Sequence, residues 1–183
     1  MGFRRRYRWI MAVDQPEDAP GSEDAPGRLP HDSFPMAILS AGVLFFDETG
    51  RVMLVRPTYK PDWGIPGGVV EASLGETPLQ AAHREVAEEL GIDVLVGPVL
   101  TIDSVPAADG HPARLAFVFD GGVLGPEQLE LIRFQDGEVA ETRFCDLDQV
   151  GRLLPPRLTR RVLSSIAARR GQGPWPVYLH HGN

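Results

Sequence analysis

The chain has 183 residues, of which 43% are hydrophobic, which is enough for one folded domain with its own core. Its 25 acidic residues outnumber its 18 basic ones, and the formal net charge of -7 argues against binding to a nucleic acid polymer, which requires clustered positive charge. No apolar run approaches the roughly 20 residues of a membrane span, and the single cysteine, Cys145, excludes an intrachain disulfide, so we expect a cytoplasmic protein without a membrane partner.

The two ends of the chain are predicted to be tails. Residues 1–33 are expected to be a disordered N-terminal tail, because Asp14 to Asp32 is rich in Pro, Glu, Asp and Gly and has little apolar surface to bury. The folded domain is expected to span 34–170, and 171–183 to form a C-terminal tail.

Two strands and a glycine turn are predicted before the first long helix. Residues 36–46 are apolar and indicate a buried strand, and 51–56 a second one, with the polar turn 47–50 making a hairpin. The loop 59–63 then leads to Gly67-Gly68. A glycine turn after a proline lets a backbone carbonyl approach a bound ion.

A helix is predicted from Thr77 to Gly91. Thr77 provides an N-cap oxygen, Pro78 suits the first helical position, and Gln80 completes a capping box. Gly91 gives the stop signal. Four apolar residues at helical spacing form the expected core-facing stripe: Leu79, Ala82, Val86 and Leu90.

The same helix carries three glutamates on one turn. Glu85, Glu88 and Glu89 stand at i, i+3 and i+4, where like charges repel by about 0.2–0.5 kcal/mol per pair. A divalent cation would reverse this repulsion, and an all-oxygen ligand set suits Mg²⁺ or Mn²⁺ better than zinc. Arg84 can hold Glu88 or Glu76 through its planar fork of donors. The alternative for this spacing is an ordinary solvated, salt-bridged helix face.

The rest of the chain adds short strands and two helices. In chain order we expect strands over 94–105, 114–119 and 141–147, helices over 148–154 and 156–170, a turn over 109–112, a polar loop over 135–138 and an ambiguous segment over 129–134. The last helix carries Arg160, Arg161, Arg169 and Arg170, which are expected to form a solvated basic face, with the steering of phosphate groups as the alternative. Short strands mixed with two main helices predict the α+β class.

One stretch of the sequence resembles the signature of a known protein family. Residues 76–92, E-T-P-L-Q-A-A-H-R-E-V-A-E-E-L-G-I, are similar to the Nudix hydrolase signature G-x5-E-x7-R-E-U-x-E-E-x-G-U, in which U is aliphatic, and match every defined position from Glu76 onward. Seven residues rather than five separate Gly68 from Glu76, which indicates a two-residue insertion within 71–75. The resemblance covers about 34–170 and implies an α/β/α sandwich around a mixed β-sheet.

The resemblance also implies a reaction, the metal-dependent hydrolysis of a diphosphate linked to another group. Glu85, Glu88 and Glu89 would hold Mg²⁺, with Mn²⁺ as the alternative, and the Gly68 carbonyl would be a further ligand. Arg84 would orient the ligating carboxylates.

The general base is left open by the resemblance. Members of the family place it either among the helix glutamates, here Glu88 and Glu89, or on a later loop, here Glu138 or Glu141. The catalytic set is therefore predicted as Arg84, Glu88, Glu89 and Glu138.

A small-molecule diphosphate is the expected partner of this site. Tyr59, Trp63 and Phe117 can stack on a base, with packing in the core as an equal alternative for Trp63. Arg56 and Arg114 can meet the phosphate or carboxylate groups of the substrate. Neither the group attached to the diphosphate nor the oligomeric state follows from the sequence, and a homodimer stays open.

Two other functions are alternatives to hydrolysis for a sequence of this family pattern. A non-catalytic nucleotide-binding Nudix module would not require the full set of carboxylates, although the inserted loop favours it. Isomerisation of isoprenoid diphosphates depends on an active-site cysteine in the family members that perform it, and Cys145 is far along the chain from the helix glutamates.

Overall fold

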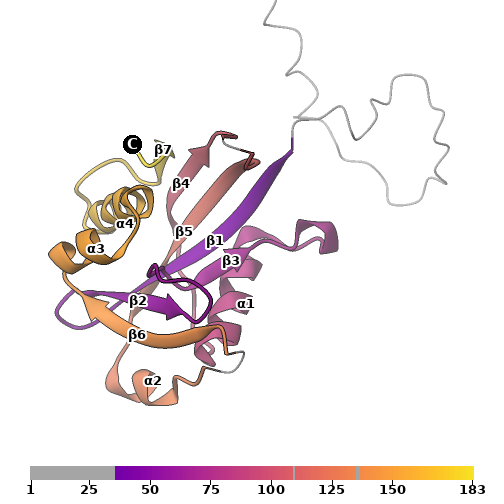
Figure 1. Ribbon diagram of the computed structural model, residues 1–183. Helices are drawn as coiled ribbons and strands as arrows, with labels where there is room; N and C mark the ends of the chain where they lie inside the picture. Colours follow the sequence, from indigo (N-terminus) through magenta and orange to yellow (C-terminus); the bar gives the residue numbers. More distant parts are fainter. Residues whose placement is uncertain (1–35, 109, 135–136) are drawn as a thin grey trace, which may run out of the picture. The chain divides into compact units, whose positions relative to one another are not determined.

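A mixed seven-stranded β-sheet forms the centre of residues 36–108, 110–134 and 137–183, which are the residues described in this computed structural model (Figure 1). The predicted N-terminal tail over 1–33 lies outside the described residues. So do Asp109 of the predicted turn and Gln135 of the predicted polar loop.

The predicted hairpin is confirmed at the centre of the sheet. Strand β1 (Ala37–Phe46) pairs antiparallel with β2 (Val52–Pro57), in a register that sets Phe46 opposite Val52. Asp47 closes the turn, because its Oδ1 accepts the backbone N–H groups of Thr49 at 3.0 Å and Arg51 at 2.8 Å.

The other strands extend the sheet on both sides of this hairpin. They are β3 (Gly67–Val69), β4 (Val99–Val105), β5 (Ala113–Val123), β6 (Val139–Cys145) and β7 (Val177–His180). The order in the sheet is β6-β2-β1-β5-β4-β7, with β5 parallel to β1, β7 parallel to β4, and β3 antiparallel to β1 on the edge opposite β5.

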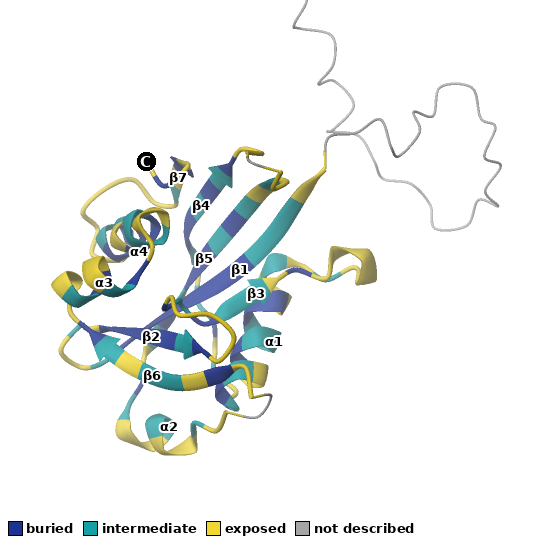
Figure 2. Ribbon diagram, viewed as in Figure 1, coloured by how far each residue is buried: buried dark blue, intermediate teal, exposed yellow. Residues whose placement is uncertain are grey.

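Helices cover both faces of the sheet (Figure 1). Helix α1 (Pro78–Leu90) packs on one face, and α3 (Leu147–Leu153) and α4 (Pro156–Arg169) pack on the other. Side chains alternate along β1, so Phe45 belongs to the core under α1 and Leu44 to the core under α4. Figure 2 shows buried residues along β1 and β2 at the centre of the sheet. This three-layer arrangement confirms the predicted α+β class with helices on both sides of a mixed sheet.

The predicted capping box of α1 is confirmed. Thr77 Oγ1 accepts from the backbone N–H of Gln80 at 3.3 Å, and Gln80 Oε1 accepts from the backbone N–H of Thr77 at 2.9 Å. Gly91 ends the helix with a φ of 68°. The apolar stripe is wrong at one position: Leu79, in the first turn, is 42% exposed, and Ala81 is buried instead.

Several predicted boundaries are corrected by the structure. Gly67 and Gly68 belong to a strand rather than a turn, because they pair with β1. The strand predicted over 94–105 begins at Val99, after Pro98, which has no N–H for a ladder. The ambiguous segment over 129–134 contains the end of a short helix, α2 (Pro126–Leu131).

The solvated basic face predicted on α4 is wrong for Arg161. Arg161 is buried and bonds to the fully buried Asp103 through Nε at 2.9 Å and Nη2 at 2.7 Å. Arg169 pairs with Asp120 at 2.9 Å. Both acids lie on strands next to α4, which the helical spacing alone does not reveal.

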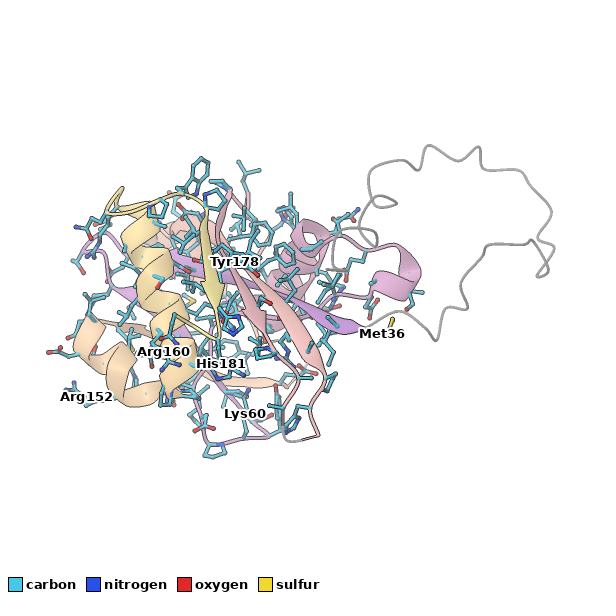
Figure 3. All side chains as sticks on the ribbon, turned by 90° about the horizontal axis from the view of Figure 1, so that it is seen from above. Met36, Lys60, Arg152, Arg160, Tyr178 and His181 are labelled. Atoms are coloured by element: carbon cyan, nitrogen blue, oxygen red, sulfur yellow. The ribbon has the colours of Figure 1, made fainter. Side chains whose placement is uncertain are left out.

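The C-terminal residues also join the sheet. β7 was not predicted, and it is held beside β4 by strand pairing and by the Gly182 N–H, which donates to Asp103 Oδ1 at 3.1 Å. Arg160 adds a bond from Nη2 to the carbonyl of His181 at 3.2 Å, and these two residues lie side by side in Figure 3. In the described part of the chain, no helix has both the length and the apolar character needed to cross a membrane.

Candidate active site

Arg84 links three of the predicted site carboxylates to one another. Its Nε donates to Glu76 Oε1 at 2.8 Å, and its Nη1 donates to Glu85 Oε1 at 2.9 Å and Glu88 Oε2 at 2.8 Å. Its Nη2 donates to the carbonyl of Val69 at 3.0 Å, which ties the helix to β3. The Arg84 hydrogen bonds hold the pKa of the Glu76 carboxyl below its usual range.

Glu89 is held apart from this group and is more deeply buried. Its Oε2 accepts the backbone N–H of Gly67 at 2.9 Å. The pKa of Glu89 is raised to about 7. Burial is the largest cause, the negative charges of Glu85 and Glu138 also raise it, and the Gly67 hydrogen bond acts in the opposite direction. Burial also raises the pKa of Glu85. The site therefore contains carboxyl groups that are costly to ionise together without a cation.

Two adjacent glycines allow these carboxylates to approach β3. A Cβ at Gly68 would overlap Glu85 Oε1, so a side chain at this position would displace the carboxylate. A Cβ at Gly67 would overlap the carbonyl oxygen of Ala41, and Gly67 has a φ of +137°, which L side chains rarely adopt. Gly68 therefore leaves room for the Glu85 carboxylate, and Gly67 allows the close approach of β3 to β1.

The donor chemistry fits a hard divalent cation. Hydrogen bonds from the described residues use one oxygen each of Glu85, Glu88 and Glu89, so the second oxygen of each is available to another ligand. Among the described residues, no three Asp, Glu, His or Cys side chains already converge as a metal cluster. Arg84 and Gly67 account for the present positions of these three carboxylates, since each bond directs a carboxylate toward its donor.

The two-residue insertion is accommodated in the loop before α1. Residues Ala72–Leu74 form a 3-10 turn, and Gly75 follows with a φ of 77°. The backbone N–H of Glu71 donates to Glu76 Oε2 at 2.7 Å, which closes the loop on itself. Glu76 thereby still reaches Arg84, and Gly68 still faces Glu85, although the spacing differs from the signature.

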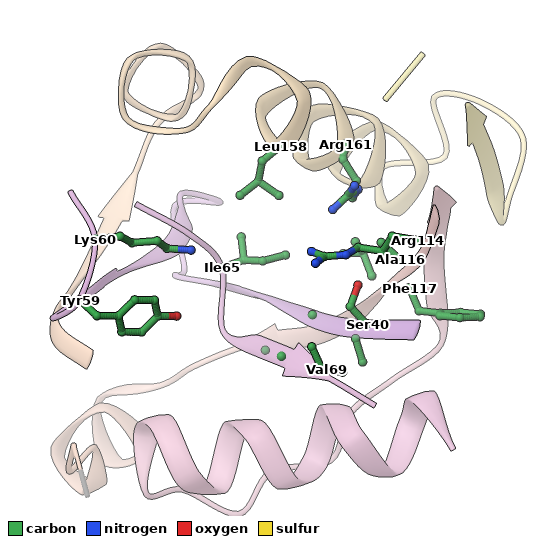
Figure 4. Close-up of a pocket in the computed structure, with 15 residues that line it drawn as sticks. Ser40, Tyr59, Lys60, Ile65, Val69, Arg114, Ala116, Phe117, Leu158 and Arg161 are labelled. Atoms are coloured by element: carbon green, nitrogen blue, oxygen red, sulfur yellow. The ribbon is translucent and has the colours of Figure 1, made fainter. Parts of the chain in front are cut away.

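A cavity of about 230 Å³ lies on the α4 side of the sheet, and Gly67 and Gly68 form part of its wall (Figure 4). Of the residues predicted to bind substrate, Tyr59, Arg114 and Phe117 border this cavity. The Phe117 side chain packs against the core under α1, on the other face of the sheet, so Tyr59 and Arg114 are the two side chains of this set that the structure brings to the cavity.

Two other predicted substrate residues lie elsewhere. Trp63 is buried in the core under α4, and the guanidinium of Arg143 stacks 4.8 Å from its ring centroid. Arg56 forms an ion pair with Glu141 at 3.0 Å on the β2–β6 side of the sheet. Neither belongs to the cavity wall.

Glu138 is an exposed residue on the loop before β6. Its backbone carbonyl accepts from the N–H of Thr58 at 2.8 Å, so the loop lies beside the one that carries Tyr59. Burial raises the pKa of Tyr59, and the negative charge of Glu138 raises it further.

The cavity also contains two basic residues that were not among the predicted substrate-binding set. Lys60 adjoins Tyr59 in the loop after β2, and Arg161 comes from α4 (Figure 4). The position of Lys60 next to Tyr59 was a usable signal. For Arg161, phosphate steering was the alternative to a solvated face, but its pairing with Asp103, 58 residues away in the chain, could not be predicted.

Comparison with known proteins supports the resemblance. The chain is 40% identical over 53 residues to the RNA pyrophosphohydrolase of Halorhodospira halophila, which covers 29% of this chain and 28% of that protein. It is 31% identical over 112 residues to the ADP-ribose pyrophosphatase of Methanocaldococcus jannaschii, covering 58% of this chain and 61% of that protein. The chain thus spans less than two thirds of the length of both relatives.

A solved structure has the same fold. The NUDIX domain of Shewanella oneidensis NrtR, complexed with ADP ribose, superimposes with a TM-score of 0.60 at 18% identity, over 79% of this chain and 93% of that domain. The family model of the NUDIX domain matches residues 36–166, which is most of the chain, so this protein belongs to the Nudix hydrolase family.

Proposed function

We propose that this protein is a metal-dependent hydrolase that cleaves the diphosphate linkage of a nucleoside diphosphate derivative. The observation that carries the proposal is the group of carboxylates ordered by Arg84 and Gly67 beside the cavity. The relative that acts on ADP-ribose and the neighbour that binds ADP ribose support a small-molecule substrate of this class. A free, buried Cys145 thiol supports the further proposal of a cytoplasmic location.

Glu85, Glu88 and Glu89, with the Gly68 carbonyl, would hold the metal, for which we propose Mg²⁺ with Mn²⁺ as the alternative. When bound, the ion would neutralise charge on the phosphoryl oxygens and lower the pKa of an attacking water. Each ligating side chain has a neighbour that fixes it, since Arg84 holds Glu85 and Glu88 and Gly67 holds Glu89.

Two residues are proposed to accept a proton during hydrolysis. Glu89 is the first candidate, because it lies on the site helix and one of its carboxylate oxygens is not engaged by the Gly67 N–H. Glu138 is the second candidate, because it is exposed on the neighbouring loop and its charge acts on Glu89.

Tyr59 lines the cavity and is proposed to stack on the base of the substrate.

Hydrolysis can be tested with a panel of nucleoside diphosphate derivatives, including ADP-ribose, by measuring product formation with Mg²⁺, with Mn²⁺ and with EDTA. We expect metal-dependent cleavage of at least one compound at the diphosphate. Saturable binding of panel compounds with no cleavage under any metal condition would instead establish the alternative, a nucleotide-binding module without turnover.

Gly68→Ala is expected to lower metal-dependent activity by about 10–100-fold, the usual consequence of misplacing a ligating group. The added methyl would push away the Glu85 carboxylate, which is the flexible end of a side chain, so the fold should tolerate it. Steady-state kinetics and the urea unfolding midpoint would be measured together.

Gly67→Ala is the matched comparison. Its methyl would meet the backbone carbonyl of Ala41 in a conformation that favours glycine, so Gly67→Ala should lower the unfolding midpoint.

The Gly68→Ala prediction would be contradicted by wild-type activity in that variant, which would show that the Glu85 carboxylate does not need its present position.

A further inference from the structure

The cavity on the α4 side is basic although the protein is acidic. The formal net charge of the chain is -7, yet the cavity wall includes Lys60, Arg114 and Arg161, and none of its described residues is acidic. Figure 4 shows the nitrogen ends of these three side chains directed toward the space between them. Such a wall attracts anions more strongly than the rest of the surface does.

The charge of Arg161 is already balanced. Its Nε and Nη2 both donate to Asp103 Oδ2, which leaves Nη1 as the donor that a ligand can use. Asp103 is itself fully engaged, since its other oxygen accepts from Gly182.

Arg114 has no such balance within the described part of the chain, where it forms no ion pair with any Asp or Glu. Burial lowers the pKa of Arg114, and the neighbouring charges of Arg157 and Arg161 lower it further. Arginine stays charged at neutral pH even so. Arg114 and Arg161 therefore line one cavity with a single carboxylate, Asp103, to balance their two charges, and a bound anion would relieve their repulsion.

The arginines lie away from the glycine pair. In the sheet register, Arg114 of β5 is opposite Ile38 and Gly68 of β3 is opposite Ala41, so the two positions are offset by three residues along β1. At a rise of about 3.3 Å per residue this offset is roughly 10 Å, and the two strands also lie on opposite edges of β1. A diphosphate held beside Gly68 would not reach Arg114, whereas the nucleoside attached to it would extend in that direction.

We infer that Arg114, with the free donor of Arg161, binds a second phosphate on the substrate, a phosphomonoester on the ribose of the nucleoside that occupies the cavity. Guanidinium groups bind phosphate through paired, charge-assisted hydrogen bonds, which makes arginine the suitable residue for this role. Preferred substrates would thus be nucleoside diphosphate derivatives with a phosphorylated ribose. This inference rests on the proposed function for the placement of the diphosphate.

The test compares two ligands that differ by one phosphate, ADP-ribose and ADP-ribose 2′-phosphate. Binding is measured by isothermal titration calorimetry with the full chain in EDTA, so that no turnover is needed. We expect the phosphorylated ligand to bind wild-type protein about tenfold more tightly, the effect of one charge-assisted contact. In Arg114→Gln the ratio of the two affinities should fall to about two or less.

Arg152→Gln is the matched control, because Arg152 is exposed on α3 and is not part of the cavity wall (Figure 3). It removes the same charge and should keep the tenfold ratio. Equal affinity of wild-type protein for both ligands, no measurable binding of either, or an unchanged ratio in Arg114→Gln would each overturn the inference.

The same ligands separate this inference from the proposed function. If Mg²⁺ supports cleavage of both compounds but the affinities are equal, hydrolysis stands and the second phosphate site is wrong. If the affinity ratio holds and is lost in Arg114→Gln, yet no panel compound is cleaved with either metal, the phosphate site stands and the hydrolase proposal is wrong.

Discussion

Glu89→Gln is expected to lower the metal-dependent kcat for diphosphate hydrolysis by about a thousandfold, because a metal site contributes several kcal/mol to the transition state and 1.36 kcal/mol is tenfold in rate. Glutamine has the same shape and keeps an oxygen that can accept from the Gly67 N–H, so the fold should be unchanged. The measurement is steady-state hydrolysis at saturating Mg²⁺, with circular dichroism to confirm folding.

The matched control for this variant is Glu130→Gln, which removes one exposed carboxylate on α2, away from the site. It should hydrolyse at the wild-type rate. A second readout is metal binding itself: Mn²⁺ should raise the melting temperature of wild-type protein and of Glu130→Gln, and raise that of Glu89→Gln less. Full activity in Glu89→Gln would remove this residue from the proposed site.

Arg161→Met is expected to lower the free energy of unfolding by about 3–5 kcal/mol, because it leaves the fully buried Asp103 without its charge partner. Methionine keeps much of the apolar stem, so the loss reports the charge rather than the packing. Asp103 also accepts from Gly182, so the anchoring of β7 depends on the same carboxylate. Urea unfolding followed by circular dichroism gives the free energy.

Two variants make this result specific. The double variant Asp103→Leu/Arg161→Met removes both charges and should recover much of the stability lost in Arg161→Met. Arg169→Met breaks the more exposed pair with Asp120 and should cost about 1 kcal/mol or less. If Arg161→Met proved as mild as Arg169→Met, the buried pair would contribute no more than a surface one.

The helix that carries the glutamates was predictable because its signals are local. Thr77, Pro78 and Gln80 cap it within one turn, and Gly91 ends it, so no distant part of the chain is needed to place it. The hairpin of β1 and β2 was predictable for the same reason, since the turn at Asp47 is closed by its own neighbours. The shared turn of Glu85, Glu88 and Glu89 follows directly from helical spacing.

Predictions failed where a residue's environment is made by a distant element. Trp63 was open between substrate stacking and core packing, and its contact with Arg143 in the core under α4 is not revealed by a loop position beside a strand. Residues Val177–His180 are too short a pattern to predict a strand, and they form one because they pair with the free edge of β4. Arg161 was assigned to a solvated face, since helical periodicity says which residues share a face and not what covers it.

The sequence by itself determined the family, the helix that carries the carboxylates and the chemistry of their oxygen donors, because these depend on residues within about 25 positions of one another. Only the tertiary structure decided which carboxylates Arg84 holds and that Gly68 lies against Glu85. It also decided that Lys60, Arg114 and Arg161 face one cavity. The physical reason is that hydrogen-bond spacing along a helix is fixed by its geometry, whereas contacts between a loop, β5 and α4 depend on the order of strands in the sheet.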